Sequence, residues 1–335
     1  MKKILYIGNN LKSTNPTTFK QLSELLGELE LDVYGYSHHK LILLRLVHMC
    51  WGVLKHRDAS FVLIDTYSTL NFYYALIISQ LARLCSIPYI PILHGGHLPS
   101  RFLKNPRLCR ILFSKASQIV TPSLYLKEFF EKQQFQTILI PNAIDLNNYP
   151  FKKRTQVHPT LLWVRAFDEI YNPLMAVEVL SLLKRSYPST TLCMIGPDKD
   201  GSMVAVQKRA EALGVAEALE ITGFLTKEAW LSKAQNFDIF INTTTIDNTP
   251  VSVIEAMALG LPVVSTNVGG MPYLIDSYKN GILVSNNNAI EMVAAIEELL
   301  NNAQLVENIT MEAKHKIANF DVSMVKQQWN KLVGS

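Results

Sequence analysis

The sequence predicts an α/β protein made of two Rossmann-like halves, each with a parallel sheet covered by helices. Short apolar runs alternate with helical stretches, and this alternation occurs twice along the chain. A turn-rich, charged segment at 149–154 separates the two series, and 335 residues are enough for two domains. We therefore expect domains at residues 1–148 and 149–319.

The first half opens with a short apolar strand at 3–8, a polar loop, and a helix that begins at Thr18. The strands that follow are nearly continuous apolar runs, as is usual for strands buried on both faces of a parallel sheet. The other strands are expected at 61–65, 88–94, 118–122 and 137–141, with helices at 69–85 and 125–132.

The second half repeats this pattern. In open parallel sheets, ligands bind beyond the carboxyl ends of the strands, so the loops that follow strands are the candidate binding loops. Strands are expected at 160–164, 191–196, 219–223, 239–241 and 262–265, and helices at about 173–186, 202–213, 226–235, 251–259 and 289–300.

The formal net charge of +4 is unevenly distributed. Residues 1–150 contain sixteen Lys and Arg against nine Asp and Glu, whereas residues 151–335 contain sixteen against nineteen. A basic half either binds an anionic surface such as phospholipid or simply keeps the protein soluble. We expect no nucleic-acid partner.

Cysteine usage and hydropathy bear on the compartment. The four cysteines (Cys50, Cys85, Cys109, Cys193) have no paired spacing, which predicts reduced thiols and a cytoplasmic protein. No Cys/His pattern has metal-ligand spacing, so we expect no metal. No uninterrupted apolar run reaches membrane-spanning length, and the apolar run at the N-terminus is too short for a signal peptide.

The most informative segment is 247–270, which combines a polar loop, a helix that opens after a proline, a buried strand and a glycine pair. Asp247 precedes the helix and Glu255 lies in its first turns, so two carboxylates and the helix N-terminus face one small volume. Free N–H groups at a helix start bind phosphate, although a capped start with proline in its first turn has the same sequence. The residues that open this helix are Thr249, Pro250, Val251 and Ser252.

This segment resembles the donor domain of retaining glycosyltransferases of family GT4 (glycosyl transferases group 1), whose GT-B fold has two Rossmann-like domains facing a central cleft. The motifs occur in the family's order and the resemblance covers 118–285, with 1–117 matching in outline. It implies that the first domain binds the acceptor, the second binds a nucleotide sugar, and a helix at about 320–335 packs back on the first domain. The motifs are at 140–145, 163–165, 195–197, 223–225 and 250–270.

The resemblance also implies roles for three charged residues. Glu255 would hold the nucleotide ribose and Asp247 the donor sugar, although the family has glutamate at the first of these positions. Arg165, at the end of a strand, would neutralise the diphosphate of the leaving group. A family lysine is replaced by Tyr171, so phosphate stabilisation would rely on Arg165, helix amides, and Lys199 or Arg101.

Further site residues follow from the same resemblance. His94, in a His-Gly sequence after a buried strand, would contact the donor sugar or the acceptor hydroxyl; a structural loop histidine is the alternative. The glycine pair Gly269-Gly270 either lets backbone approach the phosphates or forms a tight turn. The remaining candidates for nucleotide-sugar binding are Asn9, Asn10, Gly196, Gly223 and Phe224.

We therefore expect a retaining glycosyltransferase that moves a sugar from a nucleotide-sugar donor to a hydroxyl of a glycan or lipid-linked glycan, in polysaccharide or glycoconjugate synthesis. It would need no protein nucleophile, cofactor or metal. A nucleotide-sugar-binding protein without transfer activity and a GT-B sugar-nucleotide epimerase are the alternatives. A nicotinamide-dependent oxidoreductase is disfavoured because neither first strand is followed by a glycine fingerprint.

Two stretches combine cations with apolar side chains, at 39–57 and 101–115. Basic amphipathic segments bind anionic leaflets, so the protein could associate with the inner face of the membrane. The first stretch is also apolar enough to be a core helix.

Overall fold

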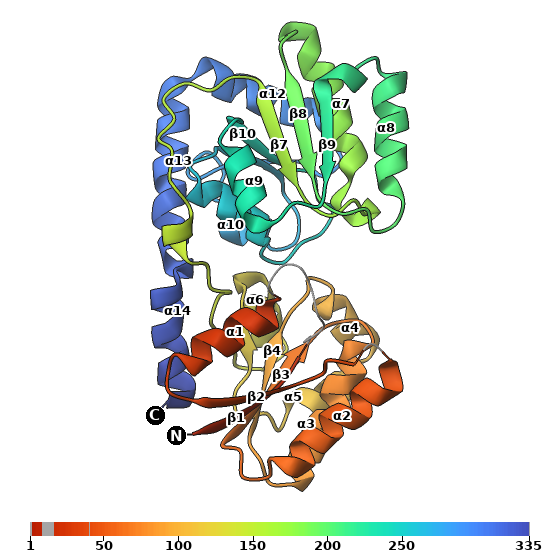
Figure 1. Ribbon diagram of the computed structural model, residues 1–335, viewed down its shortest axis with the longest axis vertical. Helices are drawn as coiled ribbons and strands as arrows, with labels where there is room; N and C mark the ends of the chain where they lie inside the picture. The colour runs from red at the N-terminus through yellow and green to blue at the C-terminus, as the bar shows by residue number, and fades with distance from the viewer. Residues whose placement is uncertain (1, 9–16, 40, 335) are drawn as a thin grey trace. The chain divides into compact units, whose positions relative to one another are not determined.

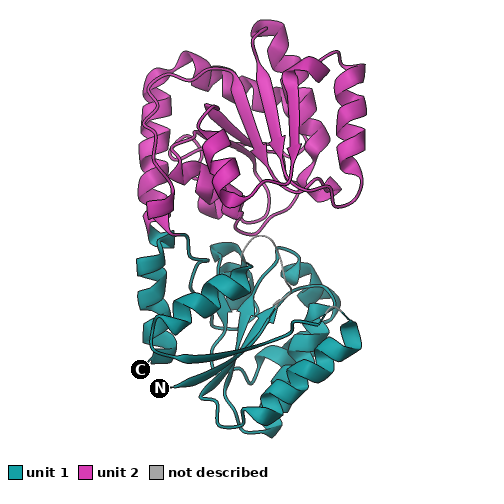
Figure 2. Cartoon of the chain, viewed as in Figure 1, with its two compact units in different colours: residues 1–144, 319–335 teal, residues 145–318 magenta. Residues whose placement is uncertain are grey.

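The computed structural model describes residues 2–8, 17–39 and 41–334, and the candidates Asn9 and Asn10 lie outside these ranges. The chain forms two compact units (Figure 2). Unit 1 contains Met1–Ile144 and Asn319–Ser335, and unit 2 contains Asp145–Ala318. The first boundary between the two units lies between Ile144 and Asp145.

Unit 1 has a six-stranded parallel sheet of order β2-β1-β3-β4-β5-β6 (Figure 1). The chain passes from β1 outward to β2 and then returns past β1 to β3, so the strand order reverses between β1 and β3. A loop crevice forms at such a reversal, beyond the carboxyl ends of the strands. The strands are β1 (Lys3–Ile7), β2 (Asp32–Tyr36), β3 (Phe61–Thr66), β4 (Tyr89–Leu93), β5 (Val120–Thr121) and β6 (Ile138–Leu139).

Two apolar clusters flank this sheet. Helices α2 to α6 pack on one face, and α1 packs with α14 on the other. The C-terminal helix thus belongs to unit 1, where Val325 and Trp329 are buried beside the first strand's Ile4 and Tyr6. The helices are α1 (Thr18–Gly27), α2 (Ile42–Lys55), α3 (Asn71–Leu84), α4 (Leu98–Lys104), α5 (Pro106–Phe113), α6 (Leu124–Lys132) and α14 (Val322–Trp329).

Unit 2 has a second six-stranded parallel sheet, of order β12-β11-β10-β7-β8-β9. Here the chain runs from β7 outward to β9 and returns to β10 on the other side of β7, so the order reverses between β7 and β10. The strands are β7 (Thr160–Val164), β8 (Thr191–Ile195), β9 (Leu219–Gly223), β10 (Ile239–Asn242), β11 (Val263–Thr266) and β12 (Ile282–Val284).

Helices surround this sheet, and its largest fully buried side chain is Trp163 of β7. Pro173 opens the long helix α7 at a first-turn position, where its missing N–H group costs nothing. The helices are α7 (Pro173–Ser186), α8 (Ser202–Ala212), α9 (Lys227–Ala234), α10 (Val251–Ala258), α11 (Met271–Leu274), α12 (Ala289–Asn301) and α13 (Ala303–Ile317).

The described residues contain no helix that is both long enough and apolar enough to cross a membrane. All four cysteines are free thiols, as the sequence predicts. Burial raises the pKa of the Cys193 thiol to about 12, so it stays protonated and unreactive at neutral pH.

Candidate functional site

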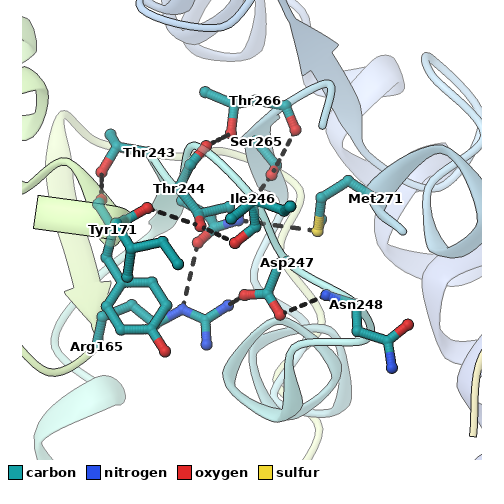
Figure 3. Close-up of polar contacts among 12 residues, drawn as sticks. Arg165, Tyr171, Thr243, Thr244, Ile246, Asp247, Asn248, Ser265, Thr266 and Met271 are labelled. Atoms are coloured by element: carbon teal, nitrogen blue, oxygen red, sulfur yellow. Dashed lines mark hydrogen bonds and ion pairs between the residues drawn. The ribbon is translucent and has the colours of Figure 1, made fainter. Parts of the chain in front are cut away.

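The reversal point of the unit 2 sheet brings together a charged pair that the sequence names. Arg165 follows β7, and its guanidinium donates to the Asp247 carboxylate (Figure 3). The guanidinium also approaches Asn242 Oδ1 of β10 at 3.5 Å. The side chains of Arg165 and Asp247 are only 13% and 16% exposed. Asp247 also accepts from the backbone N–H of Asn248 at 2.8 Å. The carboxylate is thus fixed beside the guanidinium.

The Tyr171 ring packs against this guanidinium. The Arg165 guanidinium carbon lies 4.8 Å from the centre of the Tyr171 ring, a cation–π distance (Figure 3). The position where the family carries a lysine therefore contains a side chain that orients the arginine. Thr243 Oγ1 donates to the Tyr171 carbonyl at 2.8 Å and accepts from Trp163 Nε1 at 3.0 Å, which ties this loop to the core.

The glycine pair makes a close contact with the chain itself. A Cβ atom on Gly269 would lie 2.1 Å from the Asp247 carbonyl oxygen, and one on Gly270 would lie 1.6 Å from the Asn248 carbonyl oxygen. Gly269 also has φ of +52°, and the Gly270 N–H donates to the Asp247 carbonyl at 2.9 Å. Of the two interpretations from sequence, the turn is present, and the backbone that it approaches is the loop that carries Asp247.

Glu255 is buried on α10 and bound by two groups that sequence reasoning did not name. Its Oε1 accepts from the Tyr149 hydroxyl at 2.8 Å and pairs with Lys227 Nζ, which comes from the first residue of α9. Burial, and then the Glu255 charge, raise the pKa of Tyr149 far above its usual value, so Tyr149 remains a donor. The Lys227 ammonium lies over the rings of Tyr149 and Trp230 at 4.6 Å and 5.2 Å.

The N-terminus of α10 lies between these two acids in sequence. Pro250, rather than Thr249, is the capping residue, and no side chain caps the helix. The helix itself begins at Val251. Ser252 Oγ is buried and has no hydrogen-bond partner among the described residues. An uncapped helix start beside an unsatisfied hydroxyl is suited to an anionic ligand.

Gly196 follows β8 and Gly223 ends the neighbouring strand β9, and the Gly196 N–H donates to the Gly223 carbonyl at 2.9 Å. A Cβ atom on Gly196 would lie 1.7 Å from the Arg165 carbonyl oxygen, so glycine lets these loops meet. Phe224 follows β9 with an exposed ring.

The two alternative phosphate cations have other partners. Lys199 pairs with Asp168 at 2.6 Å. Arg101 belongs to unit 1, where its guanidinium donates twice to the Ser68 carbonyl, at 2.8 and 2.6 Å. Among the described residues of unit 2, Lys199 is thus paired with an acid other than Asp247, whereas Lys227 is paired with the other candidate acid, Glu255.

His94 follows β4 in unit 1 and is buried. Its Nε2 lies 3.0 Å from Asp65 Oδ1, and the same oxygen accepts from the Tyr6 hydroxyl at 2.8 Å. Because Asp65 accepts from Tyr6, we assign the proton between Asp65 and His94 to the histidine Nε2; in the neutral imidazole, Nδ1 is then an acceptor. The residues that line a small cavity beside Asp65 include Gly8, Arg45 and Tyr67.

Three histidines gather elsewhere in unit 1, where the sequence showed no metal-ligand spacing. One ring nitrogen from each of His38, His39 and His48 lies within 4.8 Å of the others. The cluster forms because the loop before α2 folds against that helix. Within the cluster, His48 Nδ1 accepts from the Ser37 N–H at 3.4 Å.

Sequence reasoning missed Lys227, Tyr149 and Asp65. Lys227 follows a capping Thr226 and has the sequence of an ordinary solvated lysine at a helix start. Only the fold brings it and Tyr149 to Glu255, across 28 and 106 positions of chain.

Comparison with known proteins identifies the family. The structure resembles HepE of Anabaena, crystallised in complex with UDP, with a TM-score of 0.78, 17% identity and full coverage of both chains. An uncharacterized glycosyltransferase of Haemophilus influenzae is 24% identical over 154 residues, which are 46% of this chain and 42% of the relative. The amylovoran biosynthesis glycosyltransferase AmsK of Erwinia amylovora is 28% identical over 184 residues, 52% of this chain and 44% of the relative.

Both curated matches thus span less than half of the relative's length. The two parallel sheets and the structural similarity establish the GT-B fold. The family model described as glycosyl transferases group 1 matches residues 148–316, about half of the chain and nearly all of unit 2. The chain therefore belongs to the glycosyl transferases group 1 family.

Proposed function

We propose that this protein is a retaining glycosyltransferase of the GT4 type, which transfers a sugar from a nucleoside-diphosphate sugar to a hydroxyl group of a glycan or lipid-linked glycan. The observation that carries the proposal is the pairing of each candidate acid in unit 2 with a cation. Asp247 is paired with Arg165, and Glu255 is paired with Lys227.

A nucleotide sugar suits both pairs because it offers both kinds of partner. Sugar and ribose hydroxyls donate to carboxylates, and diphosphate oxygens accept from guanidinium and ammonium groups. A ligand with phosphate alone would leave two partly buried carboxylates without a donor. A free sugar would leave two cations without an anionic acceptor. We assign the sugar to Asp247, the ribose to Glu255, and the diphosphate to Arg165, Lys227 and the start of α10.

The same groups would stabilise the departing nucleotide. Cleavage of the sugar–phosphate bond adds a negative charge to the terminal phosphate of the nucleotide, and Arg165, packed against Tyr171, would stabilise this charge. The free N–H groups of α10 and the Ser252 hydroxyl add donors. A leaving-group oxygen would take the proton of the acceptor hydroxyl on the same sugar face, which gives retention without a protein nucleophile. We propose no metal and no cofactor.

We assign the acceptor to unit 1. The Asp65–His94 pair presents His94 Nδ1 as an acceptor, which fits a hydroxyl of the acceptor or donor sugar. The relative AmsK is described as acting in amylovoran biosynthesis, which favours an acceptor in polysaccharide or glycoconjugate synthesis. We place the protein in the cytoplasm, in peripheral contact with an anionic membrane where a lipid-linked acceptor would be.

The first experiment measures thermal shifts with the diphosphates of uridine, guanosine and adenosine, because a ligand that binds the native state raises its melting temperature. Uridine is the leading base, since HepE was crystallised with UDP-glucose as well as UDP. Arg165→Ala should abolish the shift. Lys199→Ala removes a nearby cation bound to Asp168 and should retain it.

The second experiment measures release of nucleotide from sugar donors, with and without glycan acceptors, and the anomeric configuration of the product. Retained configuration and acceptor-dependent release support the proposal. Tight nucleotide binding without turnover on any acceptor would favour a binding protein, and release of free nucleotide with an epimerised sugar would favour an epimerase.

A further inference from the structure

Helix α2 of unit 1 turns an apolar face to solvent. Leu43, Val47 and Trp51 are 76%, 64% and 59% exposed, and they lie one turn apart along the helix. Leu44 and Leu54 extend the same face, which carries no charged residue along its centre. Core packing does not explain these side chains, because α2 buries its opposite side through Met49 and Val53.

The neighbouring helix continues this surface. Helix α3 lies beside α2 (Figure 1), and the Tyr74 hydroxyl of α3 donates to the Ile42 carbonyl at 3.3 Å. Exposed apolar side chains recur along α3 at a helical spacing. We define the α2–α3 surface as Leu43, Leu44, Val47, Trp51 and Leu54 of α2, with Leu70, the N-cap residue of α3, and Tyr73, Ile77 and Leu84 of α3. Single exposed apolar residues are ordinary, but exposed apolar side chains gathered on two neighbouring helices mark an interaction site.

The charges around this surface have one sign. Residues 41–127 contain ten Lys and Arg but only two Asp and Glu. Asp65 is buried, and the charge of the exposed Asp58 is offset by its ion pair with Lys3. The exposed cations at the ends of α2 and α3 and on α4 and α5, which packs beside α3, are Lys55, Arg57, Arg83, Lys104, Arg107 and Arg110.

We propose that the α2–α3 surface docks unit 1 on an anionic phospholipid bilayer, with α2 lying in the interface. The apolar face would enter the boundary between headgroups and acyl chains, and the surrounding cations would contact lipid phosphates. A tryptophan such as Trp51 prefers this interfacial depth. A second copy of the chain fits the surface less well, because two basic rims would face each other.

This inference gives a location to the membrane contact proposed above, but it does not depend on transfer activity. Vesicle binding needs no sugar donor, so the failure of one proposal would be distinguishable from failure of the other.

The test uses the full chain and vesicles of phosphatidylcholine with 0 or 30 mol% phosphatidylglycerol, as about a third of anionic lipid gives a strong surface potential. Trp51 is an intrinsic reporter, because Trp163, Trp230 and Trp329 are buried. Anionic vesicles should shift the tryptophan emission to shorter wavelength and sediment the protein. Trp51→Phe should remove the emission shift. Raising the salt to about 0.5 M should weaken binding, as expected when the Debye length shortens to a few ångströms.

Two variants separate the apolar and electrostatic parts. Leu43→Ser with Val47→Ser should abolish sedimentation, whereas Ile290→Ser, an equally exposed residue of unit 2, should not change it. Lys55→Glu with Arg57→Glu should lower the partition coefficient at least 25-fold, at roughly fivefold for each cation removed.

Absence of binding to anionic vesicles would overturn the proposal. So would binding without a Trp51 emission change, since another surface would then contact the lipid. A dimer in sedimentation velocity that Leu43→Ser with Val47→Ser dissociates would instead assign the surface to a second copy.

Discussion

Replacing Lys227 with methionine should change the affinities for a nucleoside and for its diphosphate in opposite directions. In the free protein the Lys227 ammonium forms an ion pair with Glu255, the carboxylate that we assign to the ribose. Without the ammonium, Glu255 is free to accept from ribose hydroxyls, and a neutral nucleoside should bind more tightly. The diphosphate loses a cation at the same time and should bind more weakly.

The exposures of the two side chains set the magnitudes. Lys227 is 32% exposed and Glu255 is 11% exposed, so the pair is only partly shielded from solvent. We therefore limit its strength to about 1 kcal/mol, which predicts a gain of up to roughly fivefold for uridine. Loss of one charged hydrogen bond to phosphate costs about 1.5–3 kcal/mol, or roughly 10- to 150-fold for UDP.

Isothermal titration with uridine and UDP measures both affinities, with another nucleoside pair if the thermal-shift panel selects a different base. Lys233→Met is the matched control, because Lys233 lies on the same helix and pairs with Glu220 at 2.6 Å. It should leave both affinities unchanged. If Lys227→Met keeps the ratio of the two affinities at its wild-type value, Glu255 does not hold the ribose, Lys227 does not bind the diphosphate, and the assignment is wrong.

Three further predictions concern other parts of the chain. Tyr171→Ala removes the ring that packs on the Arg165 guanidinium and should weaken diphosphate binding by about 0.5–2 kcal/mol in a titration. Tyr171→Phe keeps the ring and should keep the affinity. Equal losses in both variants would contradict the cation–π role. Gly270→Ala must displace backbone and should lower the melting temperature of unit 2 by several degrees, whereas Gly27→Ala meets nothing within 4 Å and should be neutral or stabilising. Burial and, to a lesser extent, two neighbouring histidines lower the pKa of His48, so the unfolded chain binds its proton more readily. The stability of unit 1 should therefore fall as the pH decreases from 7.5 to 5.5. In thermal melts, His48→Gln should make this fall smaller. If the variant keeps the wild-type pH profile, His48 does not contribute to it.

The fold follows from sequence where strands are buried on both faces. The bounds of β7, β9 and α7 coincide with the ranges expected from apolar periodicity. Apolar periodicity does not predict the edge strands β2 and β12, because β12 has only three residues and β2 is half exposed with Gly35 as its fourth residue. Their pairing with the neighbouring strand, rather than their own hydrophobic pattern, makes them strands.

The sequence likewise predicts some residues of the candidate site and not others. Arg165 and Asp247 could be named because each lies in a local motif that follows a strand, and the strand reversal then brings them together. For Tyr171 the sequence indicates only that a tyrosine replaces a lysine. Its packing on the guanidinium is visible only in the structure. Lys227 has no local signal, since its partner is determined by how α9 and α10 pack.

The position of α14 has a consequence for biosynthesis. Val325, Trp329 and Val333 complete the apolar layer that also contains Ile4 and Tyr6 of the first strand. The N-terminal unit of a nascent chain usually folds as soon as it leaves the ribosome. Here, α1 alone covers part of that face of the first sheet until α14 has been made, and α14 begins at Val322, 183 positions after β6 ends at Leu139. Unit 2, which ends at Ala318, therefore has its whole sequence available before unit 1 does. During that interval the exposed face of the first sheet is a natural target for chaperones.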